Sequence, residues 1–358
     1  MSNVIEYKDK IAFHPGYYVR DAVEDSGLTQ EDFARRLDTT PKNLSLLIRG
    51  EQDLSIDIAS KLSVMLGTSA AYWLNLQRTY DEIKADILSE QRLTEEHDVL
   101  RCLDYFWFRK QFALEDCGSD TAGMIRNLRL FFRVSSLSVL KKPDLSVRLR
   151  IADKSMSDSD IIRTNAMIQT AMNIALQTDC PPFSRRQFER LLHRLPQMTA
   201  DADTFTDRAK QELLDCGIVL VILPYLPGSK VKGAVKKLRK KIVCLVTDRV
   251  RYEDELWFTL FHELGQIHYG DFGASFENGP DEQIADRYAE NLLVPEDAYQ
   301  DFILGKTSFS AADICLFAET VHRNPGLVVR RLRNDSLISP NNKALNALRR
   351  TRTKNRAI

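Results

Sequence analysis

Residues 28–67 constrain the fold most strongly, because helix start and stop signals there delimit two short helices: LTQEDFARRLDTTPKNLSLLIRGEQDLSIDIASKLSVMLG. Thr29 is a candidate N-cap for the first helix. Thr40 is a candidate N-cap for the second, and Pro41 then takes the first helical position, where no backbone N–H is needed. Gly50 is a left-handed terminator for this second helix. Together these signals predict a helix-turn-helix.

Apolar and polar residues separate onto opposite faces of the two helices. The inward face is formed by Phe33, Ala34, Leu37, Leu44, Leu47 and Ile48. The outward face of the second helix combines two long cations, an amide and a small hydroxyl, which suit base edges and phosphates in a major groove. The predicted DNA contacts are Gln30, Thr40, Lys42, Asn43, Ser45 and Arg49. The alternative is a structural five-helix domain with a solvated polar face.

A longer stretch, residues 13–81, resembles the HigA-type antitoxins, which are DNA-binding partners of HigB-type toxins. The matching pieces are His14-Pro15-Gly16, the Leu-Ile-Arg-Gly turn at 47–50 and the Trp-Leu-Asn-Leu-Gln sequence at 73–77. The resemblance implies a λ-repressor-like domain of five helices that represses at a palindromic operator as a homodimer. It also implies that the chain neutralises a HigB-like toxin.

Composition excludes several other classes of protein. The 358 residues are too many for one ordinary core, so about two or three domains are expected. Fifty basic and fifty acidic residues cancel, and any nucleic-acid surface must therefore be local. No apolar run approaches the length of a membrane span, and the N-terminus lacks a signal-peptide core. We therefore expect no membrane partner. Six scattered cysteines without a C-x-x-C pair predict reduced thiols in the cytoplasm.

The rest of the chain predicts a helical region followed by a small sheet with helices. Apolar residues recur with helical period over 127–140 and 159–176, and the sequence CPPF at 180–183 separates helices. From residue 217 the pattern changes to short apolar runs that predict three strands. Helices are then expected over about 254–268 and 281–293.

The stretch LWFTLFHELGQIHYGD, residues 256–271, is close to the H-E-x-x-H motif of zinc proteases. His262 and Glu263 stand where that motif has its first ligand and its general base. On the following helix, Glu282 is the candidate third ligand, and Asp286, one turn later, would orient a ligand histidine. These two helices resemble those of the ImmA/IrrE metallopeptidase family. The resemblance covers residues 210–345 and includes Gly-Ala-Val at 233–235, Trp-Phe-Thr-Leu at 257–260 and the segment 285–295.

The departure from that family is Gln266, which occupies the position of the second histidine. An amide oxygen is a weak, neutral zinc ligand compared with imidazole. His268 lies six residues after His262, about 120° round the helix, and is not placed to share a metal with it. Three alternatives remain for His262, Glu263, Gln266 and Glu282: a degenerate relic of the fold, a weakened metal site, or an active protease. We expect no bound cofactor, and zinc is the alternative.

A basic segment, KVKGAVKKLRKK at 230–241, is interpreted as a solvated β-hairpin. Its alternative is an auxiliary contact to DNA phosphates or to an acidic partner.

The expected fold class is mainly α with a small β-sheet. The expected domains are a helix-turn-helix domain (1–88), a helical middle region (89–210) and an α+β, zincin-like domain of the ImmA/IrrE type (211–358). The expected function is that of a cytoplasmic repressor and antitoxin whose C-terminal domain lacks peptidase activity. The alternatives are a zinc metallopeptidase that cleaves a repressor or antitoxin, and a repressor that senses a ligand in the former protease cleft.

Overall fold

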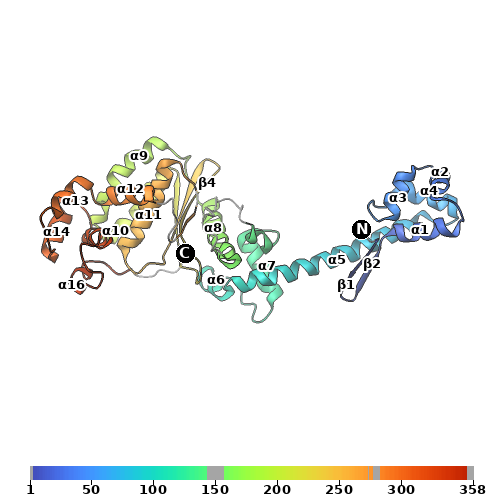
Figure 1. Cartoon of the computed structure of the whole chain (residues 1–358), viewed down its shortest axis with the longest axis horizontal. Coiled ribbons are helices and arrows are strands. Elements are labelled where there is room, and N and C mark those ends of the chain that lie inside the picture. The colour runs from blue at the N-terminus through green and yellow to red at the C-terminus, as the bar shows by residue number, and fades with distance from the viewer. Residues whose placement is uncertain (1–2, 143–156, 273, 277–282, 353–358) are drawn as a thin grey trace. The chain divides into compact units, whose positions relative to one another are not determined.

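The computed structural model describes residues 3–142, 157–272, 274–276 and 283–352. The chain divides into two compact units, Met1–Glu95 and Glu96–Ile358. Figure 1 colours the first from blue to cyan and the second from cyan to red. The boundary falls inside helix α5 (Ala70–Cys102), which therefore contributes to both units. The proposed boundaries at 88 and 210 stay predictions.

The first unit contains a two-stranded antiparallel hairpin and five helices. Its elements are β1 (Val4–Tyr7), β2 (Lys10–Phe13), α1 (Pro15–Asp25), α2 (Gln30–Arg36), α3 (Pro41–Ile48), α4 (Ile56–Leu66) and α5. The five helices are those that the sequence predicts. The hairpin is not predicted, because its strands have only four residues each and its Lys8-Asp9 turn lacks the glycine that commonly marks such turns.

The predicted helix caps of the first unit are confirmed. The Thr29 hydroxyl accepts from the backbone N–H of Asp32 at 3.1 Å, and the Thr40 hydroxyl accepts from that of Asn43 at 3.1 Å. Gly50 follows the end of α3 with φ +70°. These local contacts set where α2 and α3 begin and where α3 ends. The sequence of the segment therefore helps to position α3, in addition to its packing in the core.

The core of the first unit holds α3 against α1 and α2. Five of the six predicted inward residues are buried, and Ile48 is partly buried. Helix α1 approaches α3 so closely at Gly16 that a Cβ there would lie 1.8 Å from the Leu47 carbonyl oxygen. This contact gives a physical reason for the glycine of His14-Pro15-Gly16, because any side chain would push α3 away.

His14 caps α1 from a buried position. Its ring is 1% exposed, its Nδ1 accepts from the backbone N–H of Gly16 at 3.0 Å, and it packs edge-on against Tyr80 of α5. Burial lowers the pKa of His14, as does Lys84, while Asp53 and Asp81 oppose the shift. The cap requires a neutral imidazole, because a protonated Nδ1 donates and no longer accepts.

We therefore expect the first unit to lose stability as the pH falls below about 6.5, the ordinary pKa of histidine in an unfolded chain. The folded pKa is lower, so the unfolded state takes up the proton first, and the loss continues down to the folded value. Its slope is at most about 1.4 kcal/mol per pH unit. His14→Asn keeps an oxygen acceptor at the cap and removes the titration. Melting temperatures of both proteins from pH 8 to pH 5 test this, and equal pH dependence contradicts it.

The second unit is built around one mixed sheet. Its helices before the sheet are α6 (Tyr105–Phe112), α7 (Thr121–Phe132), α8 (Asp158–Gln177), α9 (Arg185–Arg194) and α10 (Ala202–Asp215), with 3₁₀ turns at Leu137–Lys141 and Leu195–Ala200. Strands β3 (Ile218–Leu223), β4 (Val231–Leu238), β5 (Lys241–Thr247) and β6 (Ala274–Phe276) form the sheet. Helices α11 (Glu253–Tyr269), α12 (Gln283–Leu293), α13 (Glu296–Ile303), α14 (Ala311–Thr320), α15 (Pro325–Asn334) and α16 (Lys343–Asn346) complete the unit.

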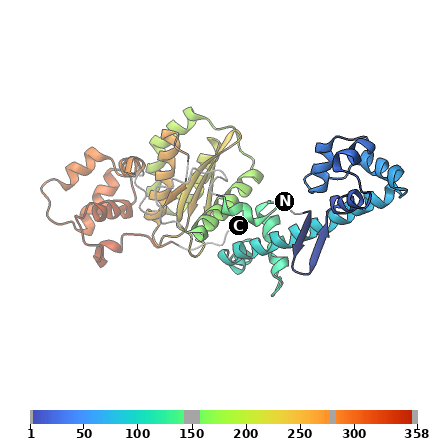
Figure 2. The same ribbon diagram turned by 45° about the vertical axis from the view of Figure 1, so that its right-hand side comes forward.

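The strand order is β3-β5-β4-β6, with β3 parallel to β5 and the other pairs antiparallel. Helix α8 packs against the sheet, and α11 packs against β4 and β5. Figures 1 and 2 show the strands between α8 on one side and α11 on the other. The predicted strands and the two helices that follow them are confirmed. The three-residue strand β6 is too short to carry a sequence pattern.

The helical prediction for 127–140 is only partly correct. Helix α7 ends at Phe132, because Arg133 takes a left-handed conformation with φ +56°, and residues 137–141 form a separate 3₁₀ turn. Three amides spaced one turn apart on α8 fasten it to this break. Asn165 donates to the Leu140 carbonyl at 2.9 Å, Gln169 to that of Phe132 at 3.1 Å, and Asn173 to that of Phe131 at 2.8 Å.

The predicted class, mainly helical with small sheets and an N-terminal helix-turn-helix, is confirmed. Within the described residues, no helix combines the length and the apolar character that a bilayer crossing requires. The six cysteines are free thiols, as the sequence predicts.

Candidate DNA interface and the His262 site

The residues that the sequence predicts to contact DNA gather at α3 and at the start of α2. Gln30, Thr40, Lys42, Asn43 and Arg49 are exposed, and Ser45 is half-buried. Arg49 forms an ion pair with Glu51 at 3.2 Å. Lys42 forms none with any residue that the structure describes. Glu51 thus partly neutralises Arg49 at the C-terminal end of α3, whereas Lys42, at the N-terminal end, is available to bind a phosphate.

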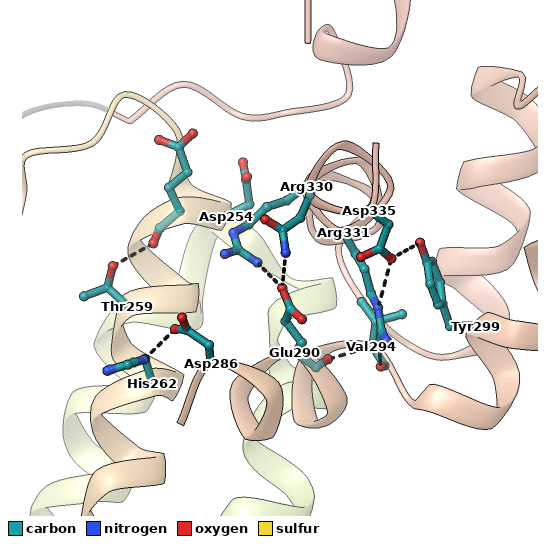
Figure 3. Close-up of polar contacts among 12 residues, drawn as sticks. Asp254, Thr259, His262, Asp286, Glu290, Val294, Tyr299, Arg330, Arg331 and Asp335 are labelled. Carbon is teal, nitrogen blue, oxygen red and sulfur yellow. Dashed lines mark hydrogen bonds and ion pairs between the residues drawn. The ribbon is translucent and has the colours of Figure 1, made fainter. Parts of the chain in front are cut away.

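The residues of the predicted protease motif lie on α11 and α12. His262, Glu263 and Gln266 are 4%, 0% and 6% exposed. The His262 Nδ1 lies 2.7 Å from a carboxylate oxygen of Asp286, on α12. Figure 3 marks this contact with a dashed line. Because a carboxylate only accepts, the Nδ1 carries a proton, and in the neutral imidazole the Nε2 of His262 then has the lone pair.

That lone pair faces Gln266. The Gln266 amide nitrogen lies 3.2 Å from the His262 Nε2 and is placed to donate to it. In a zinc protease the same lone pair would bind the metal. Among the described residues, no three His, Cys, Asp or Glu side chains gather in a way that could hold a metal ion. The predicted ligand Glu282 lies outside the described residues. Gln266 supplies an amide where the motif has its second imidazole, and an amide is a weaker zinc ligand.

Glu263 lies directly under strand β4. A Cβ on Gly233 would come within 2.2 Å of a Glu263 carboxylate oxygen, so only glycine leaves room for this side chain. Cys244 on β5 is buried nearby, and burial, together with the charge of Glu263, raises the pKa of its thiol. The closeness of Gly233 to Glu263 was not predicted, although the glycine stands inside an otherwise regular strand, which is a signal of close approach.

A second feature missed by sequence reasoning is a partly buried arginine beside the site, Arg330, whose side chain is 18% exposed. The Arg330 guanidinium lies 3.2 Å from the Phe258 ring centre and 3.9 Å from Glu290. Figure 3 places it between Asp254 and Glu290, near Asp286. Burial lowers the pKa of Arg330 to about 10, while the carboxylates of Glu290, Asp254 and Asp286 raise it. Arg330 therefore stays charged at neutral pH and offsets the negative charge around Asp286.

His268 is turned away from His262, in agreement with the helical spacing. Its Nδ1 is 3.0 Å from both carboxylate oxygens of Glu189 on α9, and its ring stacks on Tyr288 of α12. Its contacts therefore join α9, α11 and α12.

The first unit is similar in sequence to known proteins. Residues 19–73 match the family model described as Helix-turn-helix. The HTH-type transcriptional regulator YddM of Escherichia coli K12 is 33% identical over 79 residues, which are 22% of this chain and 84% of that protein. Virulence-associated protein I of Dichelobacter nodosus is 31% identical over 71 residues, or 20% of this chain and 66% of its own length.

Two solved structures are similar to about the same part of this chain as these two relatives. The first is PA4674 of Pseudomonas aeruginosa in complex with its operator DNA, at 30% identity, 20% of this chain, 81% of that chain and a TM-score of 0.20. The second is an addiction module antidote protein of a HigA family from Coxiella burnetii, at 25% identity, 24% of this chain, 92% of that chain and a TM-score of 0.22. At these TM-scores the structural likeness supports no conclusion of its own.

The fold of the first unit and its sequence matches define a DNA-binding helix-turn-helix domain. The chain belongs, through this domain, to the family of HTH-type transcriptional regulators.

Proposed function

We propose that the chain represses transcription from a palindromic operator as a homodimer and serves as the antitoxin of a HigB-like toxin. The observation that carries the DNA-binding part is the exposed, polar and cationic face of α3, which local caps and the Gly16 contact hold in place. Exposed cations and amides on such a helix bind phosphates and base edges. The antitoxin part rests on the HigA-like sequence pieces at 14–16, 47–50 and 73–77.

Protection mapping tests this proposal. Purified protein, added to the DNA upstream of its own coding sequence, should protect two half-sites about one helical turn apart, 10 to 10.5 base pairs or a multiple. Co-purification with the product of the neighbouring reading frame tests the antitoxin part. Protection of a single half-site would remove the dimer from the proposal, and no protection would remove autorepression.

For the second unit, we propose an ImmA/IrrE-like domain that does not hydrolyse peptides. The observation that favours this role is the Gln266 amide against the His262 Nε2, since it satisfies the atom that a catalytic metal would need. Metal-dependent cleavage of a repressor or antitoxin by Glu263 is the competing function. Ligand sensing through the same helix pair is the third. Cleavage by the wild-type protein that chelators and Glu263→Ala both abolish would establish the peptidase.

Restoring the histidine should restore metal binding. In Gln266→His, two imidazoles one turn apart on α11 face one point, and Glu282 is the proposed third ligand. We expect the variant to bind zinc and to melt at a higher temperature with added zinc, while the wild type shows little change. Gln266→Asn, which keeps an amide, is the control. Calorimetric zinc titration of the wild type and of each variant measures the binding, and thermal unfolding with and without zinc measures the change in melting temperature. Stoichiometric zinc in the wild type contradicts the proposal that this domain does not hydrolyse peptides.

A further inference from the structure

Helix α9 presents a strongly basic outer face on the second unit. Its sequence, RRQFERLLHR, has five basic residues and one acidic residue. Phe188, Leu191, Leu192 and the following Leu195 are buried in the core of the unit. The face opposite to these apolar residues is exposed and carries Arg186, Arg190 and His193. The helical rise places Arg190 about 6 Å along the axis from Arg186, and His193 about 4.5 Å further on.

The turn between β4 and β5 adds two more cations next to this helix. Leu238 pairs with Lys241, so Arg239 and Lys240 form a two-residue turn, and both are exposed. The Lys240 carbonyl accepts from the backbone N–H of Phe183 at 2.7 Å, just before α9 begins. Two segments distant in sequence thus bring basic side chains to one surface, which we call the α9 cationic face: the cations Arg186, Arg190, Arg239 and Lys240, together with the imidazole of His193.

The conformation of this turn is unfavourable for Arg239. Arg239 has φ +56°, a left-handed conformation in which two-residue hairpin turns favour asparagine, aspartate or glycine. A long cationic side chain in such a place costs conformational energy that a glycine would not. Residues kept in unfavourable backbone conformations concentrate at binding sites.

The other two basic residues of α9 have acidic partners. Arg185 pairs with Glu189 at 2.6 Å, and Arg194 pairs with Glu212. Over residues 157–272, 274–276 and 283–352, no side-chain hydrogen bond or ion pair engages the five residues of the α9 cationic face. In a chain with no net charge, an unneutralised group of this kind concentrates positive potential in one place.

We infer that the α9 cationic face binds the phosphate backbone of DNA as a second contact, separate from α3. This inference rests on the proposed DNA binding of the first unit and adds a contact that carries no sequence preference. Guanidinium groups on a helix and at a hairpin tip suit phosphates, since their forked donors match phosphate oxygens. Each phosphate that they neutralise releases counterions and steepens the salt dependence of binding.

The test is the salt dependence of binding of the full chain to a long duplex that contains the operator. In Arg186→Gln/Arg190→Gln, the slope of log affinity against log salt should become shallower by about 1 to 2 units, with affinity reduced roughly tenfold at moderate salt. Arg239→Gly should make the slope about 1 unit shallower. It should also keep or raise the melting temperature, because glycine accepts the positive φ.

Arg126→Gln is the matched control, because Arg126 is exposed in the same unit but already paired with Asp120 at 3.4 Å. If both charge-removing variants bind DNA with the same salt slope and affinity as this control, the α9 cationic face does not contact DNA and the inference is overturned. Lys42→Ala, in the same assay, keeps the two proposals distinguishable. It should weaken operator binding if α3 contacts DNA, whatever the α9 variants do.

Discussion

Replacing Asp254 with alanine should destabilise the second unit by about 3 kcal/mol, because it leaves the buried guanidinium of Arg349 with Glu255 as its one carboxylate partner among the described residues. The side chains of Asp254 and Arg349 are each 1% exposed. Arg349 donates to both oxygens of Asp254, at 3.1 and 3.0 Å from Nε and 2.6 Å from Nη2, and also to Glu255 at 2.8 Å. The pair ties the end of the described chain to the first turn of α11, which carries His262.

Denaturant unfolding measures this effect, and a cycle of variants separates the ion pair from its burial. Arg349→Met should cost a similar amount, whereas Asp254→Leu/Arg349→Met should cost clearly less than the two single changes together, since no buried charge is left behind. Asp98→Ala removes the partner of an exposed arginine at 3.7 Å and should change stability by less than about 1 kcal/mol. A small effect of Asp254→Ala would mean that water reaches Arg349.

The first unit was predictable from the sequence because its signals are local. Thr29, Thr40 and Gly50 each act on the backbone within a few residues, so their roles follow from sequence position alone. The closeness of Gly16 to Leu47 was not predictable in the same way, since it depends on how two helices cross.

In the second unit, contacts between segments distant in sequence were not predictable. Strand β3 was predictable from its continuous apolar run, and β4 and β5 from shorter apolar runs joined by a basic turn. The strand order was not predictable, because pairing joins segments distant in sequence. The spacing of His262 and Gln266 placed them on one face of α11, while the amide nitrogen against the Nε2 lone pair is a matter of side-chain packing. Likewise, no sequence pattern brings Lys240 beside Phe183, where the hairpin turn meets the start of α9.

Removing both long cations of α3 should have the largest effect on DNA binding. Lys42 and Arg49 lie at the two ends of the exposed face of α3, and an arginine or lysine contact to a base or a phosphate is worth roughly 1–3 kcal/mol. Lys42→Ala/Arg49→Ala should therefore weaken operator binding by about 10²-fold or more. Neither side chain packs in the core, so folding should be unaffected. Arg35→Ala is the control, because Arg35 is exposed on α2 but paired with Asp32 at 3.5 Å.

The operator affinity of these proteins, measured side by side at one salt concentration, tests most directly that the chain is a repressor acting through α3. We expect a loss of about 10²-fold or more for Lys42→Ala/Arg49→Ala and a change of less than about threefold for Arg35→Ala. Equal affinity of the double variant and the wild type for the operator would contradict it.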